Sequence, residues 1–411
     1  MSNKFFPIIL GSDENAYATA RCINDEYGII PLCLCSKALV QTERSKILTI
    51  KEVKDLDKPE IFVKALLAEL KAREDERKII VIPCADYYTE LLVKNYHLFE
   101  NRIANRFISP ELLESISTKD GFYSMCEHYG LYYPQTVICD YEDRLGVCKS
   151  LPFGFPIVMK PENSNASEYL HCSFEGKKKV YFLKSEEEYL RVVTAMSKAG
   201  YEGKLILQKL VRGGDTTSFV INSYSGLDGK VKFMCMGQAL LEEYAPHMLG
   251  NYAGIMSVSV PELYSQVEKL LNDIGFVGFS NIDVKYDSES GKFCFFELNP
   301  RHGRSSFFVY AAGYNMMSEL ISDVVDQETR NEVKYGDNEA IWATIPKKTL
   351  LRYITDKNVE QKAKALIKEK GIVYTLKNPK DKNLIRSLKF YKITLNKIKS
   401  FKNYFFDKTR L

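Results

Sequence analysis

The periodicity of apolar residues in the N-terminal part is what most restricts the fold of this chain. Short apolar runs such as FFPIIL and GIIPLCLC are each followed by a segment with helical spacing, and the run Lys78–Ile82 repeats the pattern. Strands that alternate with amphipathic helices predict a small parallel sheet covered by helices. Asp13 and Asp86 follow strand ends, where open parallel sheets bind ligands. A helix cap is an equally good interpretation of these aspartates.

The pattern changes after Ser117, where hairpin-like strands replace the strand–helix alternation. The clearest hairpin is NIDVKYD–SESG–KFCFFELN, in which two alternating runs flank a short turn. We therefore predict α/β structure at the N-terminus and α+β structure beyond it. The expected divisions are an α/β domain over residues 1–114, a second domain over 115–325 and a C-terminal extension over 326–411.

Composition excludes a membrane protein and a small single-core domain. The chain has 411 residues, of which 45% are hydrophobic and 27% charged, as in ordinary globular proteins. No apolar stretch approaches the roughly 18 residues that a membrane span needs, and the start lacks the pattern of a signal peptide. Ten cysteines are scattered without zinc-ligand spacing. We expect a cytoplasmic protein with free, buried thiols.

The C-terminal segment carries a charge of its own. Residues 351–411 contain 17 Lys and Arg against 5 Asp and Glu, which gives +12, although the net charge of the chain is only +4. Lysines alternate with Phe, Tyr, Leu and Ile over residues 378–410, which favours a basic amphipathic helix. Such a helix either packs on the body with its basic face in solvent or meets an anionic partner. The candidate partners are a membrane surface and a nucleotide-linked precursor.

Two lysines and a strand end are suited to binding a nucleotide. Lys160 ends the apolar run FPIVMKP, and with Lys119 it could neutralise the α- and β-phosphates. Taken alone, Lys160 is only a charged strand end. The strand that ends at Gln208 leaves into a glycine turn, so its backbone could bind an adenine edge. Asp215, seven residues after Gln208, could hold ribose hydroxyls.

Polar side chains also gather on the hairpin. Glu297 and Asn299 are two residues apart and point to the same face of one strand, and Asp283 lies on the partner strand. Hard oxygen ligands on one sheet face predict a Mg²⁺ site completed by phosphates and water. Arg301 has the same parity and is placed to meet a phosphate. Apolar neighbours such as Phe295 favour a cleft over a polar strand face in open solvent.

In this order the motifs resemble those of the ATP-grasp superfamily, which has a first lysine, a strand-end lysine, a hinge and a metal strand of the form acid-x-Asn-x-Arg. The matching segments are Lys119, Ile157-Val158-Met159-Lys160-Pro161, Leu207-Gln208-Lys209 and Glu297-Leu298-Asn299-Pro300-Arg301. The resemblance covers roughly residues 115–325 and implies an ATP-grasp fold behind a parallel pre-ATP-grasp domain, and the charge pattern adds a basic helical tail. Within that fold, a lid subdomain would cover about 118–207 and a metal-site subdomain about 208–325.

The resemblance also implies the roles of individual residues. ATP and Mg²⁺ would be the cofactors, with Asp283, Glu297 and Asn299 as metal ligands. Lys160, Arg301 and Arg304 would be catalytic. The nucleotide would be held by Lys119, Lys160, Gln208, Lys209, Leu210, Val211 and Asp215.

Two departures from the family pattern bear on the nucleotide site. The segment Asn163–Ser167 stands where a glycine-rich phosphate loop is usual. The hinge has Gln208 where many members have Glu, but its amide still offers a carbonyl to the adenine amino group.

A narrower similarity, to the D-aspartate ligases of peptidoglycan side-bridge synthesis, covers about residues 1–355. It rests on LGSD, FEGKKKVYFL, LGNYAG, NIDVKYD, FELNPRHGRSSFF and IWATIPKK. It implies that the β-carboxyl of D-aspartate is activated as an acyl phosphate. The acceptor would be the lysine side chain of a UDP-N-acetylmuramyl pentapeptide. Arg304, with Ser305, Ser306 and Asp13, would hold the donor.

Three alternatives remain open on the sequence alone. An ATP-grasp ligase could make another dipeptide or natural-product amide. A non-catalytic nucleotide-binding regulator could use the same scaffold. The intact set Asp283, Glu297 and Asn299 argues against it, because a protein that only binds a nucleotide has less need of a two-metal arrangement. The basic tail alone motivates a nucleic-acid-binding protein, but we expect no nucleic-acid partner. The resemblance is compatible with a homodimer.

Overall fold

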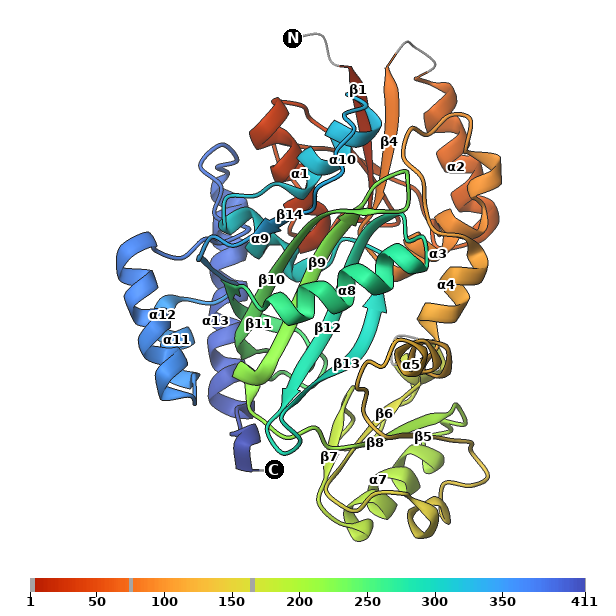
Figure 1. The fold of residues 1–411 in the computed structure, drawn as a ribbon, viewed down its shortest axis with the longest axis vertical. Coiled ribbons are helices and arrows are strands. Elements are labelled where there is room, and N and C mark those ends of the chain that lie inside the picture. Colours follow the sequence, from red (N-terminus) through yellow and green to blue (C-terminus); the bar gives the residue numbers. More distant parts are fainter. Residues whose placement is uncertain (1–3, 74–76, 163–166, 411) are drawn as a thin grey trace.

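The computed structural model describes residues 4–73, 77–162 and 167–410, and its N-terminal part is a parallel sheet of four strands (Figure 1). The strand order is β3-β2-β1-β4, with all pairs parallel. One helix packs on one face and two on the other, so the inner strands are continuous apolar runs. The elements are β1 (Phe5–Leu10), α1 (Glu14–Tyr27), β2 (Leu32–Cys35), β3 (Thr49–Glu52), α2 (Pro59–Lys71), β4 (Lys78–Pro83) and α3 (Asp86–Lys94).

Two short helices lead from this domain into the rest of the chain. After the 3₁₀ turn η1 (Tyr96–Leu98) come α4 (Pro110–Ser117) and α5 (Lys119–His128). The hydroxyl of Thr118 accepts a hydrogen bond from the Gly121 N–H at 3.2 Å and so caps α5. This cap fixes Lys119 at the first position of the helix.

A small antiparallel sheet forms a separate layer, at the bottom of the view in Figure 1. Its order is β5-β8-β6-β7, and it has its own hydrophobic core with α7. Ser185 caps α7. The elements are β5 (Thr136–Cys139), η2 (Val147–Ser150), β6 (Ile157–Pro161), α6 (Ser167–His171), β7 (Tyr181–Leu183), α7 (Glu186–Lys198) and β8 (Leu205–Lys209).

The central sheet has the order β13-β12-β9-β10-β11-β15, with β14 paired to β10. Helix α8 packs on one face, and α9, α10 and α1 on the other. The predicted hairpin is β12 and β13. The elements are η3 (Asp215–Thr217), β9 (Ser218–Ser225), β10 (Val231–Glu242), β11 (Tyr252–Val258), α8 (Pro261–Asp273), β12 (Gly278–Asp287), β13 (Lys292–Asn299), η4 (Arg304–Ser306), α9 (Phe307–Ala311) and α10 (Met316–Val324).

The C-terminal segment contributes two strands to the central sheet. β14 (Lys334–Gly336) pairs parallel with β10, and β15 (Ile341–Ala343) pairs antiparallel with β11. Both strands belong to the central sheet although they follow residue 326, the predicted start of the extension. The helices are α11 (Lys347–Tyr353), α12 (Lys357–Lys370), α13 (Leu384–Tyr404) and the 3₁₀ turn η5 (Lys408–Arg410).

The predicted basic helix of the tail is α13, and it lies alongside the central sheet (Figure 1). Phe401 is fully buried, with its ring 5.9 Å from that of Tyr244 and 5.5 Å from that of Tyr353. The predicted fold class, a parallel α/β domain followed by an ATP-grasp fold and a helical tail, is confirmed. Among the described residues, no helix has the length and apolarity needed to cross a bilayer.

Candidate active site

The predicted metal ligands lie together on the β12–β13 hairpin. Asp283 and Glu297 are directly opposite in the antiparallel register, and Asn299 donates through Nδ2 to Glu297 Oε1 at 3.2 Å. The Tyr252 hydroxyl donates to Asp283 Oδ1 at 2.7 Å, which fixes that carboxylate from β11. Glu297 is 45% exposed, so a ligand can reach it. Three oxygen-bearing side chains therefore share one sheet face.

Positive charge converges on this carboxylate pair. Lys119 Nζ lies 3.3 Å from Glu297 Oε2 and donates to the Phe296 carbonyl at 2.8 Å. Lys119 is the main cause that holds the pKa of Glu297 well below its usual range, and Lys160 on β6 adds to it. Burial, together with the neighbouring Glu297, raises the pKa of Asp283. The two predicted phosphate lysines thus come from different elements to one place.

The charged form of Lys160 is disfavoured at this place. Burial, with the like charge of Lys119, lowers its pKa to about 8, although Glu297 and Asp283 act in the opposite direction. Two ammonium groups side by side are favourable only next to strong negative charge. The polyphosphate of a nucleotide would supply that charge.

The donor set fits Mg²⁺. Within residues 4–73, 77–162 and 167–410, no group of three or more His, Cys, Asp or Glu side chains is arranged to hold a metal. The site offers the two carboxylates of Asp283 and Glu297 and the amide of Asn299. Mg²⁺ commonly binds through one or two carboxylates and takes its remaining ligands from phosphates and water.

The predicted hinge connects the small sheet to the central sheet. Gln208 is buried and donates through Nε2 to the Tyr123 hydroxyl at 2.7 Å and to Thr136 Oγ1 at 2.9 Å, which leaves its Oε1 for an incoming donor. Lys209 is the last residue of β8. Leu210 and Val211 follow, and both are buried.

Asp215 has partners that the sequence did not suggest. Its carboxylate accepts hydrogen bonds from the Tyr244 hydroxyl at 3.0 Å and the Glu242 N–H at 2.9 Å, and Lys408 Nζ lies 2.9 Å away. Lys408 also pairs with Glu242 at 2.5 Å. Asp215, for which we predicted a contact with ribose hydroxyls, is thus paired with a lysine of η5 in this structure, and its role towards a nucleotide stays a prediction. No local signal marks Lys408, which is one of many lysines in a basic tail.

Arg301 forms a bidentate ion pair with Asp86. Its Nε donates to Asp86 Oδ1, and its Nη2 lies 3.1 Å from Asp86 Oδ2. Asp86 begins α3, so this pair joins the N-terminal domain to the loop after β13. Asn15 of α1 also stabilises this loop. Its Nδ2 donates hydrogen bonds to the carbonyl of His302 in the loop, at 2.6 Å, and to the carbonyl of Cys84, at 3.0 Å. Burial lowers the pKa of His302 to about 3, so its ring is neutral. Sequence reasoning did not identify Asn15.

The predicted donor-binding residues are brought close together. Asp13 caps α1, accepting from the N–H groups of Asn15 and Ala16, each at 3.1 Å. Burial raises the pKa of Asp13, and the Arg304 guanidinium opposes this. Ser306 accepts from the Gly303 N–H at 2.9 Å and bonds to Asn222, so it shapes the loop. Ser305 is half-buried beside it.

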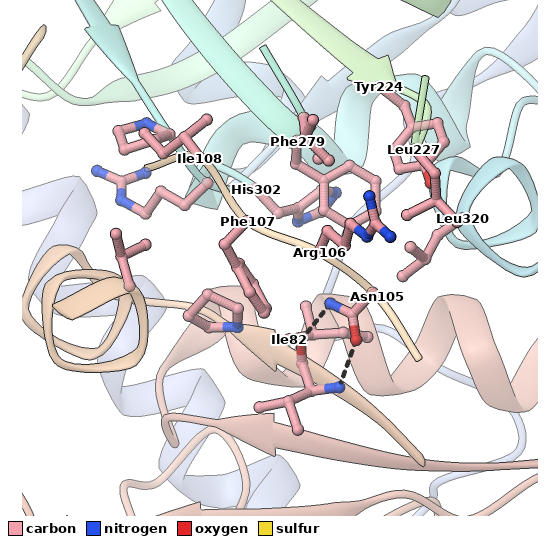
Figure 2. A pocket seen from close by; sticks show the side chains of 17 residues that line it. Ile82, Asn105, Arg106, Phe107, Ile108, Tyr224, Leu227, Phe279, His302 and Leu320 are labelled. Carbon is pink, nitrogen blue, oxygen red and sulfur yellow. Dashed lines mark hydrogen bonds between the residues drawn. The ribbon is translucent and has the colours of Figure 1, made fainter. Parts of the chain in front are cut away.

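Of the predicted phosphate loop Asn163–Ser167, residues 163–166 lie outside the described residues, and Ser167 begins α6. A small cavity has a volume of about 30 Å³ and is lined by residues that include Asn105, Phe107, Phe279, Arg301 and His302 (Figure 2). That volume suits water rather than a substrate.

The architecture matches known ATP-grasp structures. N5-carboxyaminoimidazole synthetase from Staphylococcus aureus, complexed with ADP, superposes with a TM-score of 0.59 at 12% identity over 83% of each chain. L-amino acid ligase from Bacillus licheniformis superposes with a TM-score of 0.57 at 12% identity, covering 81% of this chain and 78% of that one. Together with the lysine–carboxylate site and the sequence relative described next, the fold defines an ATP-dependent ligase of the ATP-grasp superfamily.

The sequence comparison narrows the class. The chain is 35% identical over 412 residues to D-aspartate ligase of Enterococcus faecium (strain Aus0004), covering 98% of this chain and 97% of the relative. No family model matches it. The chain belongs to the D-aspartate ligase family.

Proposed function

We propose that this ligase activates the β-carboxyl of D-aspartate as an acyl phosphate. The lysine side-chain amine of a UDP-N-acetylmuramyl pentapeptide would then attack it, forming an amide. The observation that carries this proposal is the facing pair Asp283 and Glu297 with Lys119 and Lys160 directed at it. Such a site binds a metal–nucleotide complex and needs no protein nucleophile, because positioning and charge stabilisation account for most of the rate in phosphoryl transfer.

Each group at the site has a task in this scheme. Asp283, Glu297 and Asn299 would hold Mg²⁺, which when bound neutralises charge on the transferred phosphoryl group. Lys119 and Lys160 would bind the phosphates, and the backbone at Leu210 and Val211 with Gln208 would bind the adenine. Arg301, which reaches the site from its pair with Asp86, would meet the transferring phosphate.

The donor is inferred from Arg304 and from the family. D-Aspartate has two carboxylates, and one must be held while the other is phosphorylated. A planar guanidinium can grip a carboxylate through two parallel hydrogen bonds. Arg304 is close enough to Asp13 to lower the pKa of that carboxyl, which supports a role for Arg304, with Ser305, in holding the donor.

The decisive experiment measures ADP release with single amino acids, with and without the UDP-linked precursor, and identifies the product by mass. We expect D-aspartate to be used well and D-alanine poorly, because D-alanine lacks the side-chain carboxylate. If D-alanine or an L-amino acid is the better donor, the enzyme is a ligase for another dipeptide or natural product. No turnover with any acid would favour the nucleotide-binding regulator.

We also propose a membrane-surface contact through the outer face of α13. Leu384, Leu388 and Leu395 on this face are 77%, 62% and 46% exposed, and exposed lysines such as Lys392 flank them. Apolar side chains between lysines are typical of helices that lie on anionic bilayers. Sedimentation with anionic vesicles should decline on Leu388→Glu, and no change would argue against it. A homodimer stays a prediction, which the mass in solution would test.

A further inference from the structure

A large cavity separates α13 from the body of the enzyme. Its volume is about 1260 Å³, above the roughly 300–1000 Å³ of pockets for drug-sized ligands. α13 lines it from Arg386 to Tyr404, or about 27 Å of helix at 1.5 Å per residue. Arg304 and Glu14 also line it, so it adjoins the predicted donor site. We call it the α13 cavity. An amino acid would fill little of it.

The lining of the α13 cavity is basic. It contains six lysines and arginines and three carboxylates. Two of these cationic side chains are neutralised by carboxylates. Lys397 pairs with Glu243 at 2.7 Å, and Arg386 pairs with Asp381. Lys382 and Lys399 are exposed, and neither forms an ion pair with any described residue. The cavity therefore has unneutralised positive charge to offer an anionic ligand.

Buried donors without partners point to a ligand as well. Asn378 Nδ2, Arg386 Nε and Ser400 Oγ are buried and have no hydrogen-bond partner, and all three residues line the α13 cavity. Asn378 is only 7% exposed, and its Oδ1 is already bonded to the Lys380 N–H at 2.9 Å. Buried polar groups are almost always satisfied in native proteins. Acceptor oxygens of a bound molecule would satisfy these donors.

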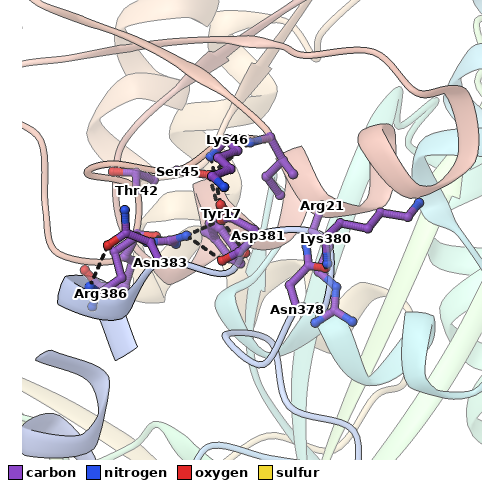
Figure 3. A network of polar contacts seen from close by, with 12 residues as sticks. Tyr17, Arg21, Thr42, Ser45, Lys46, Asn378, Lys380, Asp381, Asn383 and Arg386 are labelled. Carbon is purple, nitrogen blue, oxygen red and sulfur yellow. Dashed lines mark hydrogen bonds and ion pairs between the residues drawn. The ribbon is translucent and has the colours of Figure 1, made fainter. Parts of the chain in front are cut away.

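One wall of the α13 cavity is held by hydrogen bonds to the N-terminal domain, and the lining also contains aromatic side chains. Asp381 accepts from the Tyr17 hydroxyl at 2.9 Å, Ser45 Oγ at 2.8 Å and the Lys46 N–H at 2.7 Å, which holds the start of α13 on the N-terminal domain (Figure 3). The aromatic lining residues are Tyr374, Phe390, Tyr391 and Tyr404. Rings of this kind can stack on a nucleobase.

From these observations we propose that the α13 cavity is the acceptor site, and that it takes an elongated, anionic, nucleoside-diphosphate-linked peptide whose free amine points to the Arg304 end. This inference rests on the proposed function and adds the place where the second substrate binds. Lys382 and Lys399 supply charge to the phosphates and carboxylates. Asn378 and Ser400 donate hydrogen bonds to the peptide or sugar.

The test compares two pairs of charge reversals. In Lys382→Glu/Lys399→Glu both changed residues line the cavity, whereas in Lys392→Glu/Lys402→Glu both are exposed lysines of α13 outside the lining. With UDP-N-acetylmuramyl pentapeptide as acceptor, we expect the first pair to raise KM about tenfold or more and the second less than about twofold. KM for ATP and D-aspartate should not move in either. Equal effects in the two pairs, or none, would overturn the assignment.

A second variant and a partial reaction separate binding from folding. Asn378→Asp keeps the oxygen bonded to the Lys380 N–H, replaces the unpartnered donor by an acceptor and adds a negative charge that an anionic ligand would meet. It should raise KM for the acceptor, yet leave acyl phosphate formation from D-aspartate, trapped with hydroxylamine, at the wild-type rate. An unchanged KM, or loss of both reactions, would count against the cavity.

Failure of the proposed function can be told apart from failure of this inference. If the wild type makes no product from D-aspartate and this precursor, the proposed function fails. The cavity is then judged by direct binding of the precursor. The chain has one tryptophan, Trp342, whose Nε1 donates at 2.9 Å to Thr375 Oγ1 in the cavity lining. Its emission should saturate with the precursor in the wild type and in Lys392→Glu/Lys402→Glu, but not in Lys382→Glu/Lys399→Glu. No saturation in the wild type would overturn the inference.

Discussion

At the scale of single residues, Glu297 is the side chain on which the other polar groups of the site converge. Lys119 and Lys160 both act on it, and Asn299 bonds to its other oxygen. We expect Glu297→Gln to lower turnover by at least about a hundredfold, because a charge of the proposed metal site is lost where the phosphoryl group must be neutralised. ADP formation at saturating Mg²⁺ measures this. Asp283→Asn should also reduce turnover severely while leaving the fold intact.

Glu289→Gln provides the matched control. Glu289 lies on the turn of the same hairpin, and the ion pair it forms among the described residues is with Arg212, at 3.6 Å. It should retain wild-type turnover. Normal ADP formation by Glu297→Gln would show that the metal site lies elsewhere.

Arg304 should decide the affinity for the donor. We expect Arg304→Lys to raise KM for the amino acid by roughly tenfold and KM for ATP much less, because an ammonium cannot reproduce two parallel hydrogen bonds to a carboxylate. Steady-state kinetics with each substrate varied in turn provides the measurement. A parallel rise in both constants would point to a damaged loop rather than a lost donor contact.

At the scale of elements, the Asp381 network holds α13 on the N-terminal domain. Burial alone would raise the pKa of Asp381, but hydrogen bonds from the Lys46 N–H, Ser45, Arg386 and Tyr17 lower it overall. Asp381→Asn should therefore reduce the free energy of unfolding by about 3 kcal/mol at pH 7, since Arg386 is left buried without its counter-charge. Urea unfolding checks this.

The same network predicts a pH dependence. Because the folded-state pKa of Asp381 lies below its ordinary value of 3.8, its contribution is fully present above that pH and is lost as the pH falls through the folded pKa. The difference in unfolding free energy between wild type and Asp381→Asn should hence shrink in strongly acidic solution. A difference that grows on acidification would contradict this account.

Lys408 holds η5 on the central sheet in a comparable way. Its side chain is 5% exposed between Asp215 and Glu242, whose attraction raises its pKa despite burial. Lys408→Met should lower the free energy of unfolding by about 3 kcal/mol, because two buried carboxylates lose their partner. Lys402→Met, at an exposed position of α13, should change it by less than about 0.5 kcal/mol. Equal midpoints for the two variants would rule out this role.

Elements with a local signal were predictable, whereas partnerships between distant segments were not. The β12–β13 hairpin follows from two alternating runs around SESG, and with it the alignment of Asp283, Glu297 and Asn299. β14 and β15 have three residues each, too few to show a period. Arg301 with Asp86, and Lys408 with Asp215, are pairs whose members lie far apart in the sequence, so no local pattern links them before the fold brings them together.

At the scale of the whole molecule, the tail is part of the body rather than an appendage. Removing residues 378–411 would take away Asp381, Phe401 and Lys408 together. We expect the shortened chain to unfold at a lower urea concentration and to lose activity with every substrate. A truncated chain with the wild-type midpoint and a raised KM for the acceptor alone would mean that the tail only binds substrate.

The pairing of Lys408 with Asp215 and Glu242 bears on how the chain matures during synthesis. These carboxylates are buried beside the central sheet, yet their counter-ion, Lys408, is synthesised 166 residues after Glu242. A nascent chain that has already folded its N-terminal domain must keep this region hydrated and loosely packed until that lysine emerges. We therefore expect the region around Asp215 and Glu242 to become rigid last, and a chain halted before residue 408 to be cleaved there by proteases more readily than the full chain.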